Sequence, residues 1–560
     1  MPAPAGSSAR GVATGVVGVI VAALVGVPLF RLAQVLWQAR TGSLRDSLGS
    51  AGLRAALLNT IVLALAVTVA GVAIGVAMAL VLRRPGLPGR PFWRAAVLLP
   101  VLVPDFVLGY SWTAAYSRGG VSDSALGLSW AGLLGPAGVW LVLVVNAAPL
   151  AYLVVASALA ARAEPALEQA ARSSGASATT ALFTITLRLA LPAVAAAAVL
   201  VFVLSLGAFA IPQVLGAPAG FATVTTRIYA DLSVGGAESS FVEAVALALL
   251  LVVVTVVCIA PADALLGRRL RSDRLTSTDE ETGAAPRRWV DRGLAAGLAT
   301  YLLLSVGLPL GALVLSSLTR AVGVPATPGN WTVAHYREVL TPRSGAALGR
   351  SLGLAVAAAS LLTILGGLVA ALERRRSGRL AATLITLTLV LPGSTLAVAL
   401  SITYGRWLSG TLLLILLGYL AKLWAFAHRP IAGALDRLPP DELRAARASG
   451  ATALTALRTV VLPPLSPALL AAWMICFLTA LHEVTMSSVL YGPGSETLAV
   501  VVLNSAELGR PGPTAALSVV VCLVVAVPVL TLWLGLALTR ARRPGRAPVP
   551  APALELQHVP

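Results

Sequence analysis

Four side chains that can gain or lose a proton stand in strongly apolar parts of this 560-residue chain: Asp105, Tyr110, His482 and Glu483. Ionisable groups are costly in such surroundings and are candidate functional residues by default. Ferric iron is a hard cation that prefers oxygen ligands, and Asp105, Tyr110 and Glu483 could offer them. These four residues are our candidates for lining a polar path through the apolar part of the protein.

Each candidate also has a structural explanation. Asp105 follows Pro104 and could cap a helix that is broken at this proline. His482 and Glu483 are neighbours, and neighbouring side chains on a helix point about 100° apart, which disfavours both as ligands of one ion. Glu483 could also lie near the outer water interface. Three further polar residues could link helices by hydrogen bonds, namely Asn59, Asn146 and Lys422.

The composition places the chain in a membrane. Hydrophobic residues make up 58% of it and charged residues 11%, whereas an average soluble chain has about 25% charged residues. The run IVLALAVTVAGVAIGVAMALVL at 61–82 exceeds the roughly 20 apolar residues that span a bilayer as a helix. The fold class that we predict is all-α integral membrane. The cysteines lie in apolar runs without paired spacing, so we predict no disulfide and no metal site at Cys258, Cys476 and Cys522.

Hydropathy and charge predict about twelve membrane spans. In the first half they lie near 12–34, 56–82, 94–115, 137–160, 190–213 and 241–266. In the second half they lie near 293–318, 352–372, 381–404, 411–428, 467–490 and 515–538. The first run is too long for a secretory signal and lacks a cleavage site, so we interpret it as a span.

Arginines predict the orientation. Basic segments at 83–94, 267–274, 373–379 and 540–546 fall on one face, which the positive-inside rule assigns to the cytoplasm together with both termini. The formal net charge of +18 therefore belongs to loops of an inner-membrane protein and does not indicate nucleic-acid binding.

The two halves of the chain form an internal sequence repeat. ALLNTIVLALAV at 56–67 corresponds to ALGRSLGLAVAA at 347–358, and LPVLVPDFVLGYSW at 99–112 corresponds to LVLPGSTLAVALSI at 389–402. Two modules of six spans each would share one orientation and be related by an axis along the membrane normal. We predict a first module at 1–266, a cytoplasmic linker at 267–292, a second module at 293–539 and a disordered cytoplasmic tail at 540–560.

One polar sequence occurs twice, as PALEQAARSSGA at 165–176 and PDELRAARASGA at 440–451. Each copy lies between the fourth and fifth spans of its half, within loops 161–190 and 436–466. Its proline suits the first turn of a helix, and Gly175 and Gly450 suit the left-handed residue that ends one. We predict a helix, a glycine bend and a second helix in each loop. A single copy could be an ordinary amphipathic surface helix, but two at equivalent positions indicate a docking element.

These loops resemble the EAA motif of the membrane subunits of binding-protein-dependent ABC importers. That motif runs Glu-Ala-Ala, three residues, Gly, nine residues and Ile/Val-x-Leu-Pro. Both copies lack its glutamate, although Glu168 and Glu442 lie close by, and Arg188 stands where the first copy should have its proline. The residues that match or replace the motif are Gln169, Ala170, Ala171 and Gly175 in the first copy and Arg444, Ala445, Ala446 and Gly450 in the second.

In that family the motif forms a coupling helix that docks on a separate ATPase subunit. The resemblance implies the type I importer fold with two tandem permease modules, two bound copies of an ABC ATPase and an extracytoplasmic solute-binding protein. It also implies that this chain is no enzyme. A phosphate-binding loop needs Gly-Lys followed by Ser or Thr, but the only lysine, Lys422, precedes a leucine. We therefore expect no cofactor here, with ATP and magnesium bound by the ATPase.

Fused permeases of this kind are most similar to the iron(III) importers. LTALHEVTMSSVLYGPGSETLAVVVLNSAELG at 478–509 resembles an iron-type segment, with His482-Glu483 in place of Lys-Glu. The segment NWTVAHYREVL at 330–340 resembles the start of an iron-type second module. The resemblance implies iron(III) as the cargo and leaves thiamine, a polyamine or another small solute as alternatives.

Two other classes of protein fit the sequence less well. A secondary transporter of six plus six spans would also have parallel halves, but it has no reason to repeat a glycine-bent helix, and 83–94 and 373–379 lack its Asp-Arg signature. A membrane enzyme would need clustered carboxylates, histidines or a nucleophile at one depth. The four histidines are scattered along the chain.

Overall fold

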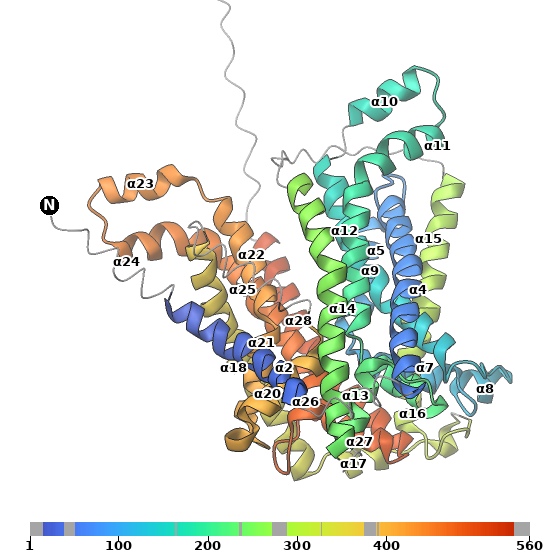
Figure 1. The fold of residues 1–560 in the computed structure, drawn as a ribbon. Coiled ribbons are helices and arrows are strands. Elements are labelled where there is room, and N and C mark those ends of the chain that lie inside the picture. Colours follow the sequence, from blue (N-terminus) through green and yellow to red (C-terminus); the bar gives the residue numbers. More distant parts are fainter. Residues whose placement is uncertain are drawn as a thin grey trace, which may run out of the picture.

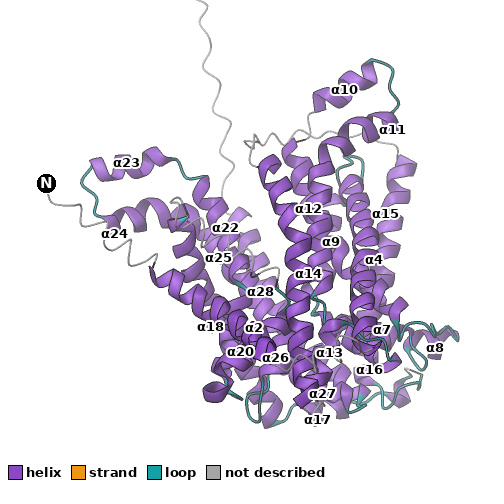
Figure 2. Ribbon diagram, in the orientation of Figure 1, coloured by secondary structure: helices purple, strands orange, loops and turns teal. Residues whose placement is uncertain are grey.

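The fold is helical throughout the part that the computed structural model describes, which comprises residues 15–38, 51–162, 165–233, 238–270, 288–325, 327–373, 388 and 391–541. In these ranges the only β-pairing is an isolated bridge between Thr319 and Trp331. Figures 1 and 2 show two groups of long helices that meet near one end of the molecule. The all-α membrane fold is confirmed.

The first half of the chain forms the helices from η1 to α14. Their boundaries coincide with prolines, glycines and arginines that interrupt the apolar runs. They are η1 (Ala22–Gly26), α2 (Val27–Gln38), α4 (Ala51–Leu82), α5 (Arg90–Ala96), α6 (Leu99–Leu102), α7 (Asp105–Tyr116), α8 (Val121–Leu126), α9 (Pro136–Arg162), α10 (Pro165–Ser173), α11 (Ala178–Ala181), η2 (Leu182–Thr186), α12 (Leu187–Leu206), η3 (Pro212–Gly216), η4 (Ala217–Ala219), α13 (Val224–Ser233) and α14 (Glu238–Leu270).

The second half forms the helices from α15 to α28. Its elements are α15 (Arg288–Leu302), η5 (Leu303–Gly307), α16 (Leu308–Leu318), η6 (Pro328–Asn330), α17 (Ala334–Val339), α18 (Pro342–Leu372), α20 (Gly393–Leu408), α21 (Leu412–Lys422), α22 (Trp424–Asp436), α23 (Pro440–Ala448), α24 (Ala453–Ala456), η7 (Leu457–Val461), α25 (Leu462–His482), α26 (Thr485–Leu490), α27 (Leu498–Glu507) and α28 (Pro511–Ala541).

Among the described residues, nine helices are long and apolar enough to cross a membrane, and two bent helix pairs raise the number to 11. Eleven of the twelve expected spans thus have a counterpart. Of the remaining one, 381–404, the first part falls mostly outside the described residues and the second part lies in α20, which begins at Gly393. The fifth span differs from the expected 190–213, because its helix covers Thr179–Leu206 and ends at Gly207. The expected linker and tail also lie mostly outside the described ranges.

The first helix of each half packs against the other half. Tyr404 of α20 donates its hydroxyl to the carbonyl of Ala23 at 2.7 Å, and α2 lies beside the helices of the second half in Figure 1. In return, Trp112 of α7 donates to the carbonyl of Ser305 at 3.0 Å. The two halves therefore exchange their first helices and form one interlocked bundle.

Equivalent glycines let equivalent helices approach closely in the two halves. A Cβ atom added to Gly75 of α4 would lie 2.6 Å from the Cβ of Ala151 in α9. A Cβ atom added to Gly366 of α18 would lie 2.9 Å from the Cβ of Ala427 in α22. No side chain fits into such contacts, so the repeat seen in the sequence is also a repeat of helix packing.

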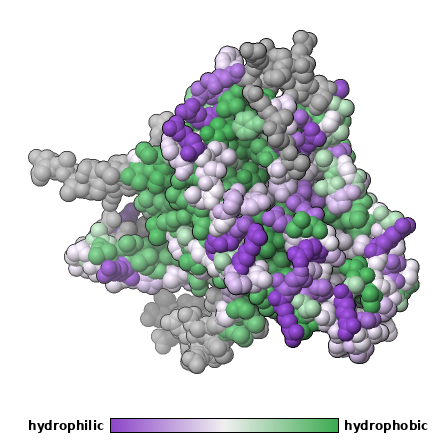
Figure 3. Space-filling view, turned by 90° about the horizontal axis from the view of Figure 1, so that it is seen from below, coloured by the Kyte–Doolittle hydropathy of each residue, from purple (hydrophilic) through white to green (hydrophobic). Residues whose placement is uncertain are grey.

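Both copies of the repeated loop lie at the same end of the molecule. Figure 1 shows α10 and α11 above one group of helices and α23 and α24 above the other. The opposite end faces the viewer in Figure 3, where hydrophilic residues cover much of the surface and alternate with hydrophobic ones. The repeated loops project from the end opposite to the one seen in Figure 3.

Candidate functional site

A cavity of about 370 Å³ lies between the two halves. Its walls come from α7, α9 and α12 of the first half and from α21, α22 and α25 of the second. Most of the lining is apolar. The polar and charged side chains that line it are Asp105, Asn146, Ser205, Lys422, Thr479, His482, Glu483 and Thr485.

Two polar pairs face each other across this cavity. In the first half, the amide of Asn146 donates to Asp105 at 2.9 Å. In the second half, the ammonium of Lys422 lies 3.4 Å from a carboxylate oxygen of Glu483. Asp105 also interacts electrostatically with both members of the second pair. The arrangement places two carboxylates and one ammonium around a single internal space.

The cavity brings together three of the four residues that the sequence singled out. Asp105, His482 and Glu483 all line it, and Tyr110 does not. Tyr110 interacts instead with Glu507 and Tyr229. Lys422 and Asn146, for which the sequence left only a helix-linking role, complete the polar lining. Lys422 could have been identified as a candidate site residue from the sequence, because it is the only lysine and every other basic residue apart from histidine is an arginine.

Local helix breaks orient the two carboxylates. Asp105 is the first residue of α7 and follows Pro104, and the helices before and after this break are bent by 97°. Glu483 ends α25 in an extended conformation, and its carboxylate accepts a hydrogen bond from the backbone N–H of Met486 at 2.8 Å. The helix is broken at Pro104 as expected, but Asp105 does not cap it, because Pro104 is the N-cap and no side chain makes a capping hydrogen bond there. Glu483 is buried.

Among the described residues, the cavity lining includes a buried polar atom without a partner, which belongs to His482. Its Nε2 atom is buried there without a hydrogen-bond partner. In the described ranges, the structure brings no three histidine, cysteine, aspartate or glutamate side chains together in an arrangement that could hold a metal ion. The site can therefore present charge to a solute, but not a complete set of such ligands.

The repeated loops have the predicted form. α10 is followed by Gly175 with a φ of 89°, and α23 is followed by Gly450 with a φ of 81°. A second short helix begins after each bend, at Ala178 and Ala453. The expectation of helix, glycine bend and helix is confirmed in both copies.

The motif residues of both loops face outward. Gln169, Ala170, Arg444 and Ala445 are exposed, while Ala171 and Ala446 are half-buried. Large apolar side chains beside them are also open, with Leu167 44% exposed on the first loop and Leu454 55% exposed on the second. Small and apolar side chains at a polar end of the molecule form a surface that suits a protein partner.

The two loops differ in how they are held. Glu168 of α10 is near Thr186, whose hydroxyl donates to it at 3.4 Å. It also interacts with Arg83 in the loop after α4, where burial lowers the pKa of the arginine and Glu168 partly offsets this effect. Glu442 of α23 is exposed. The first loop is thus tied to the membrane helices by a carboxylate close to the position where the motif has its glutamate.

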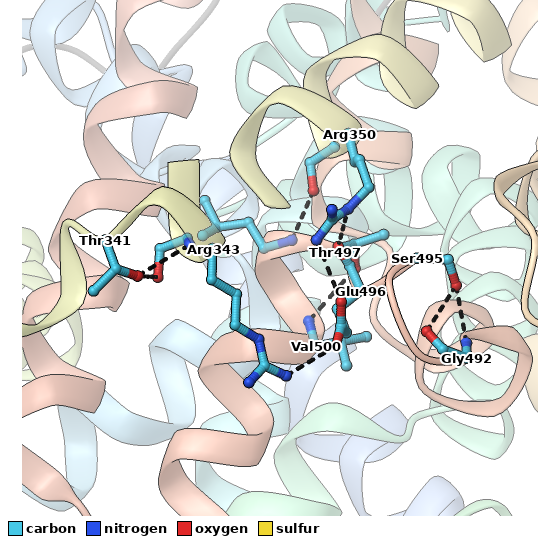
Figure 4. A network of polar contacts seen from close by, with 11 residues as sticks. Thr341, Arg343, Arg350, Gly492, Ser495, Glu496, Thr497 and Val500 are labelled. Atoms are coloured by element: carbon cyan, nitrogen blue, oxygen red, sulfur yellow. Dashed lines mark hydrogen bonds and ion pairs between the residues drawn. The ribbon is translucent and has the colours of Figure 1, made fainter. Parts of the chain in front are cut away.

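A second polar network lies at the end opposite to the loops. Figure 4 shows Glu496, in the segment before α27, between two arginines of α18. Arg343 donates to its carboxylate at 2.9 Å, and Arg350 donates to its carboxylate at 3.3 Å and to its carbonyl at 2.9 Å. Burial alone would raise the pKa of Glu496. Its hydrogen bonds and the two arginines lower this pKa by more, so the net shift is downward. The sequence analysis did not single out this carboxylate.

The chain matches one family over two segments. The family described as "Binding-protein-dependent transport system inner membrane component" matches residues 71–272 and 363–543. Each segment contains one copy of the repeated loop and most of one half of the molecule. The boundaries of 1–266 and 293–539 that the sequence suggested for the modules remain predictions.

Curated relatives include transport proteins with different cargoes. The probable ABC transporter permease protein y4fN of Sinorhizobium fredii is 26% identical, and the alignment covers 92% of each chain. The Fe(3+)-transport system permease protein FbpB 2 of Haemophilus influenzae is 25% identical over 85% of this chain and 89% of the relative. The putrescine transport system permease protein PotI of Escherichia coli is 29% identical, over 42% of this chain and 88% of the relative.

Proposed function

Because the chain belongs to the family of binding-protein-dependent transport system inner membrane components, we propose that this ABC importer permease carries iron(III) across the membrane. An extracytoplasmic binding protein delivers the solute, and a separate ATPase supplies the energy. The chain has no cofactor of its own, and ATP and magnesium are bound by the ATPase. Both termini lie in the cytoplasm, on the side of the repeated loops.

The coupling role of the repeated loops rests on their geometry. Two glycine-bent helices project from one end of the molecule, and each exposes alanines and a leucine that a groove on a partner can receive. Two equivalent loops fit two copies of the ATPase. The residues that we assign to this contact are Glu168, Gln169, Ala170, Ala171, Gly175, Glu442, Arg444, Ala445, Ala446 and Gly450.

Iron(III) is the cargo supported by the similarity to a double-length relative. The iron(III) permease aligns over 85% of this chain, whereas the putrescine permease aligns over 42%. The carboxylates of Asp105 and Glu483 offer the hard oxygen atoms that ferric iron prefers. Together with His482 they form the path that we propose for the solute. Tyr110, which lies outside the cavity, would belong to the part of the path near Glu507.

Uptake measurements test the cargo. A strain that lacks the chain should lose binding-protein-dependent uptake of radiolabelled iron(III) and grow poorly when iron is limiting, while uptake of thiamine and putrescine stays unchanged. Re-expression of the intact chain should restore iron uptake. Normal growth under iron limitation together with lost uptake of putrescine or thiamine would reject iron(III) and identify the alternative.

A further inference from the structure

In the central cavity, positions that are equivalent in the two halves differ in charge. Asp105 begins α7 after Pro104, and Gly393 begins α20 after Pro392. Glu483 follows α25, and Ala208 stands at the equivalent place after α12, because these two helices begin at the same point of the repeat, at Leu462 and Leu187. Each carboxylate of the cavity therefore has an uncharged residue at the equivalent position of the other half, Gly393 for Asp105 and Ala208 for Glu483.

The same comparison pairs Lys422 with Asn146. Asn146 stands five residues before Ala151, which touches Gly75, and Lys422 stands five residues before Ala427, which touches Gly366. In the first half the amide of Asn146 meets the carboxylate of Asp105. In the second half the corresponding partner is a glycine, so the lysine has no carboxylate of its own at that position.

The missing side chain at 393 provides the room that Lys422 uses. A Cβ atom added to Gly393 would lie 2.7 Å from the Nζ atom of Lys422. From there the ammonium reaches Glu483 at 3.4 Å and interacts electrostatically with Asp105. Its side chain remains 24% exposed. The lysine thus occupies space that a side chain at 393 would fill, and its ammonium lies close to the carboxylate of Glu483.

We propose that Lys422 is a tethered cation that occupies the acidic subsite formed by Asp105 and Glu483 while the cavity is empty, and that a cationic solute displaces it. This inference rests on the proposed importer function and narrows its cargo to solutes with positive charge. A lysine suits this role, because its compact ammonium sits on a flexible chain, whereas arginine has a rigid fork that binds carboxylates in two places. The distance of 3.4 Å is longer than the roughly 2.7–2.9 Å of a strong charge-assisted hydrogen bond, so the ammonium is loosely held and easier to displace.

The class of solute follows from the lining. The described residues place only two carboxylates in the cavity and no three-ligand metal group. The subsite therefore attracts a cation by charge alone. A metal ion would keep most of its coordination shell as water or a chelator, whereas an organic cation needs no further ligands. An anion would meet two carboxylates with a single ammonium between them and would be repelled.

Binding of Tb³⁺ to the purified full chain in lipid nanodiscs tests the proposal without either partner protein. Tyr419 lies beside Glu483, with its hydroxyl 3.5 Å from the carbonyl of that residue, and can sensitise terbium luminescence. We expect Lys422→Met to raise the affinity for Tb³⁺ at least about tenfold, since two carboxylates then lose a nearby competing charge. Lys422→Arg should keep the affinity low.

Two further variants separate this effect from non-specific binding. Asp105→Asn in the Lys422→Met background should reverse the gain, whereas Asp123→Asn, which removes a carboxylate outside the cavity, should not. Near-ultraviolet circular dichroism of each variant checks that the fold is retained. Equal Tb³⁺ affinity with and without Lys422 would overturn the proposal. So would binding of inorganic phosphate that Lys422→Met abolishes, because Lys422 would then be an anion receptor.

The outcome is separable from that of the importer function. The binding assay needs neither ATPase nor binding protein, so a negative result there leaves the importer function standing. A failure of the importer function would be seen as unchanged solute uptake in the deletion strain, whatever the terbium result.

Discussion

At the scale of single residues, Glu496 shows how a buried carboxylate can hold a segment in place. Its side chain and its carbonyl accept hydrogen bonds from two arginines of α18, and only 7% of the residue is exposed. The segment before α27 is fastened to α18 by these contacts. A buried hydrogen-bonding group that loses its partners costs free energy, so removing the charge of Glu496 should lower the stability of the fold.

We expect Glu496→Gln to lower the free energy of unfolding by about 2 kcal/mol at neutral pH, because charge-assisted hydrogen bonds are lost. Since the pKa of Glu496 is lowered in the fold, its contribution is complete above the ordinary carboxyl pKa and disappears as the pH falls through the lowered value. Thermal unfolding in detergent between pH 7 and pH 3 measures this. Glu338→Gln, in an exposed pair with Arg510, is the control and should change little. A loss that is equal at both ends of this pH range would refute the role of the charge.

The sequence predicted three of the ionisable residues that line the site, but not which residues pair with each other. Asp105, His482 and Glu483 could be singled out because ionisable groups are rare in apolar runs. The position of Tyr110 outside the cavity and the pairing of Lys422 with Glu483 depend on how helices far apart in the chain pack together. Periodicity alone contains no such information. The Glu496 network likewise joins positions that are 146 and 153 residues apart.

At the scale of elements, the glycine bends are the feature that the sequence predicted best, because a local residue type determines them. Both glycines have a positive φ, and nothing lies within 4 Å of a Cβ atom built on either. A substitution there is strained by the backbone and not by crowding. The shape of each loop can therefore be changed without disturbing the membrane helices.

We expect Gly175→Val and Gly450→Val each to abolish uptake while leaving the amount of protein in the membrane unchanged. A left-handed conformation costs a residue with a Cβ atom about 1–2 kcal/mol, so the bend should shift and the loop should lose its fit to the ATPase. Uptake, ATPase activity and membrane content are measured together. Gly127→Val imposes the same strain at another open position, with a φ of 67°, and should preserve transport. Full uptake by both loop variants would refute the coupling role.

The exchange of first helices is the element-scale feature that the sequence did not predict. Hydropathy indicates where a helix crosses the membrane, but not which helix it packs against. The exchanged helix α15 is held by an ion pair between Arg84, after α4, and the buried Asp291, at 2.6 Å. This contact fastens the start of the second half to the first half near the repeated loops.

Asp291→Ala should destabilise the protein by about 3 kcal/mol, because it leaves the partly buried Arg84 without this partner. The loss should appear as a lower midpoint of thermal unfolding in detergent. Replacing both residues, with Arg84→Met and Asp291→Leu, should recover much of it, since an apolar pair needs no charge partner. An unchanged midpoint in the single variant would show that the ion pair does not hold α15.

At the scale of the whole molecule, two interlocked halves enclose one charged cavity and present two loops at one end. Motion at the loops can reach the cavity through continuous helices, because α12 leads from the first loop to Gly207 and α25 leads from the second loop to Glu483. An ATPase that moves the loops would therefore move the ends of the helices that bound the solute path. This connection joins the two parts of the proposed function.

The most direct test is site-specific crosslinking from the loops in native membranes. A photoreactive amino acid placed at Ala170 or Ala445, both exposed, should crosslink to an ABC ATPase subunit at each position. The same residue at Leu126, 72% exposed on α8, should not. Crosslinks from Ala170 and Ala445 to lipid alone, with the ATPase present and active in the same membranes, would contradict the account.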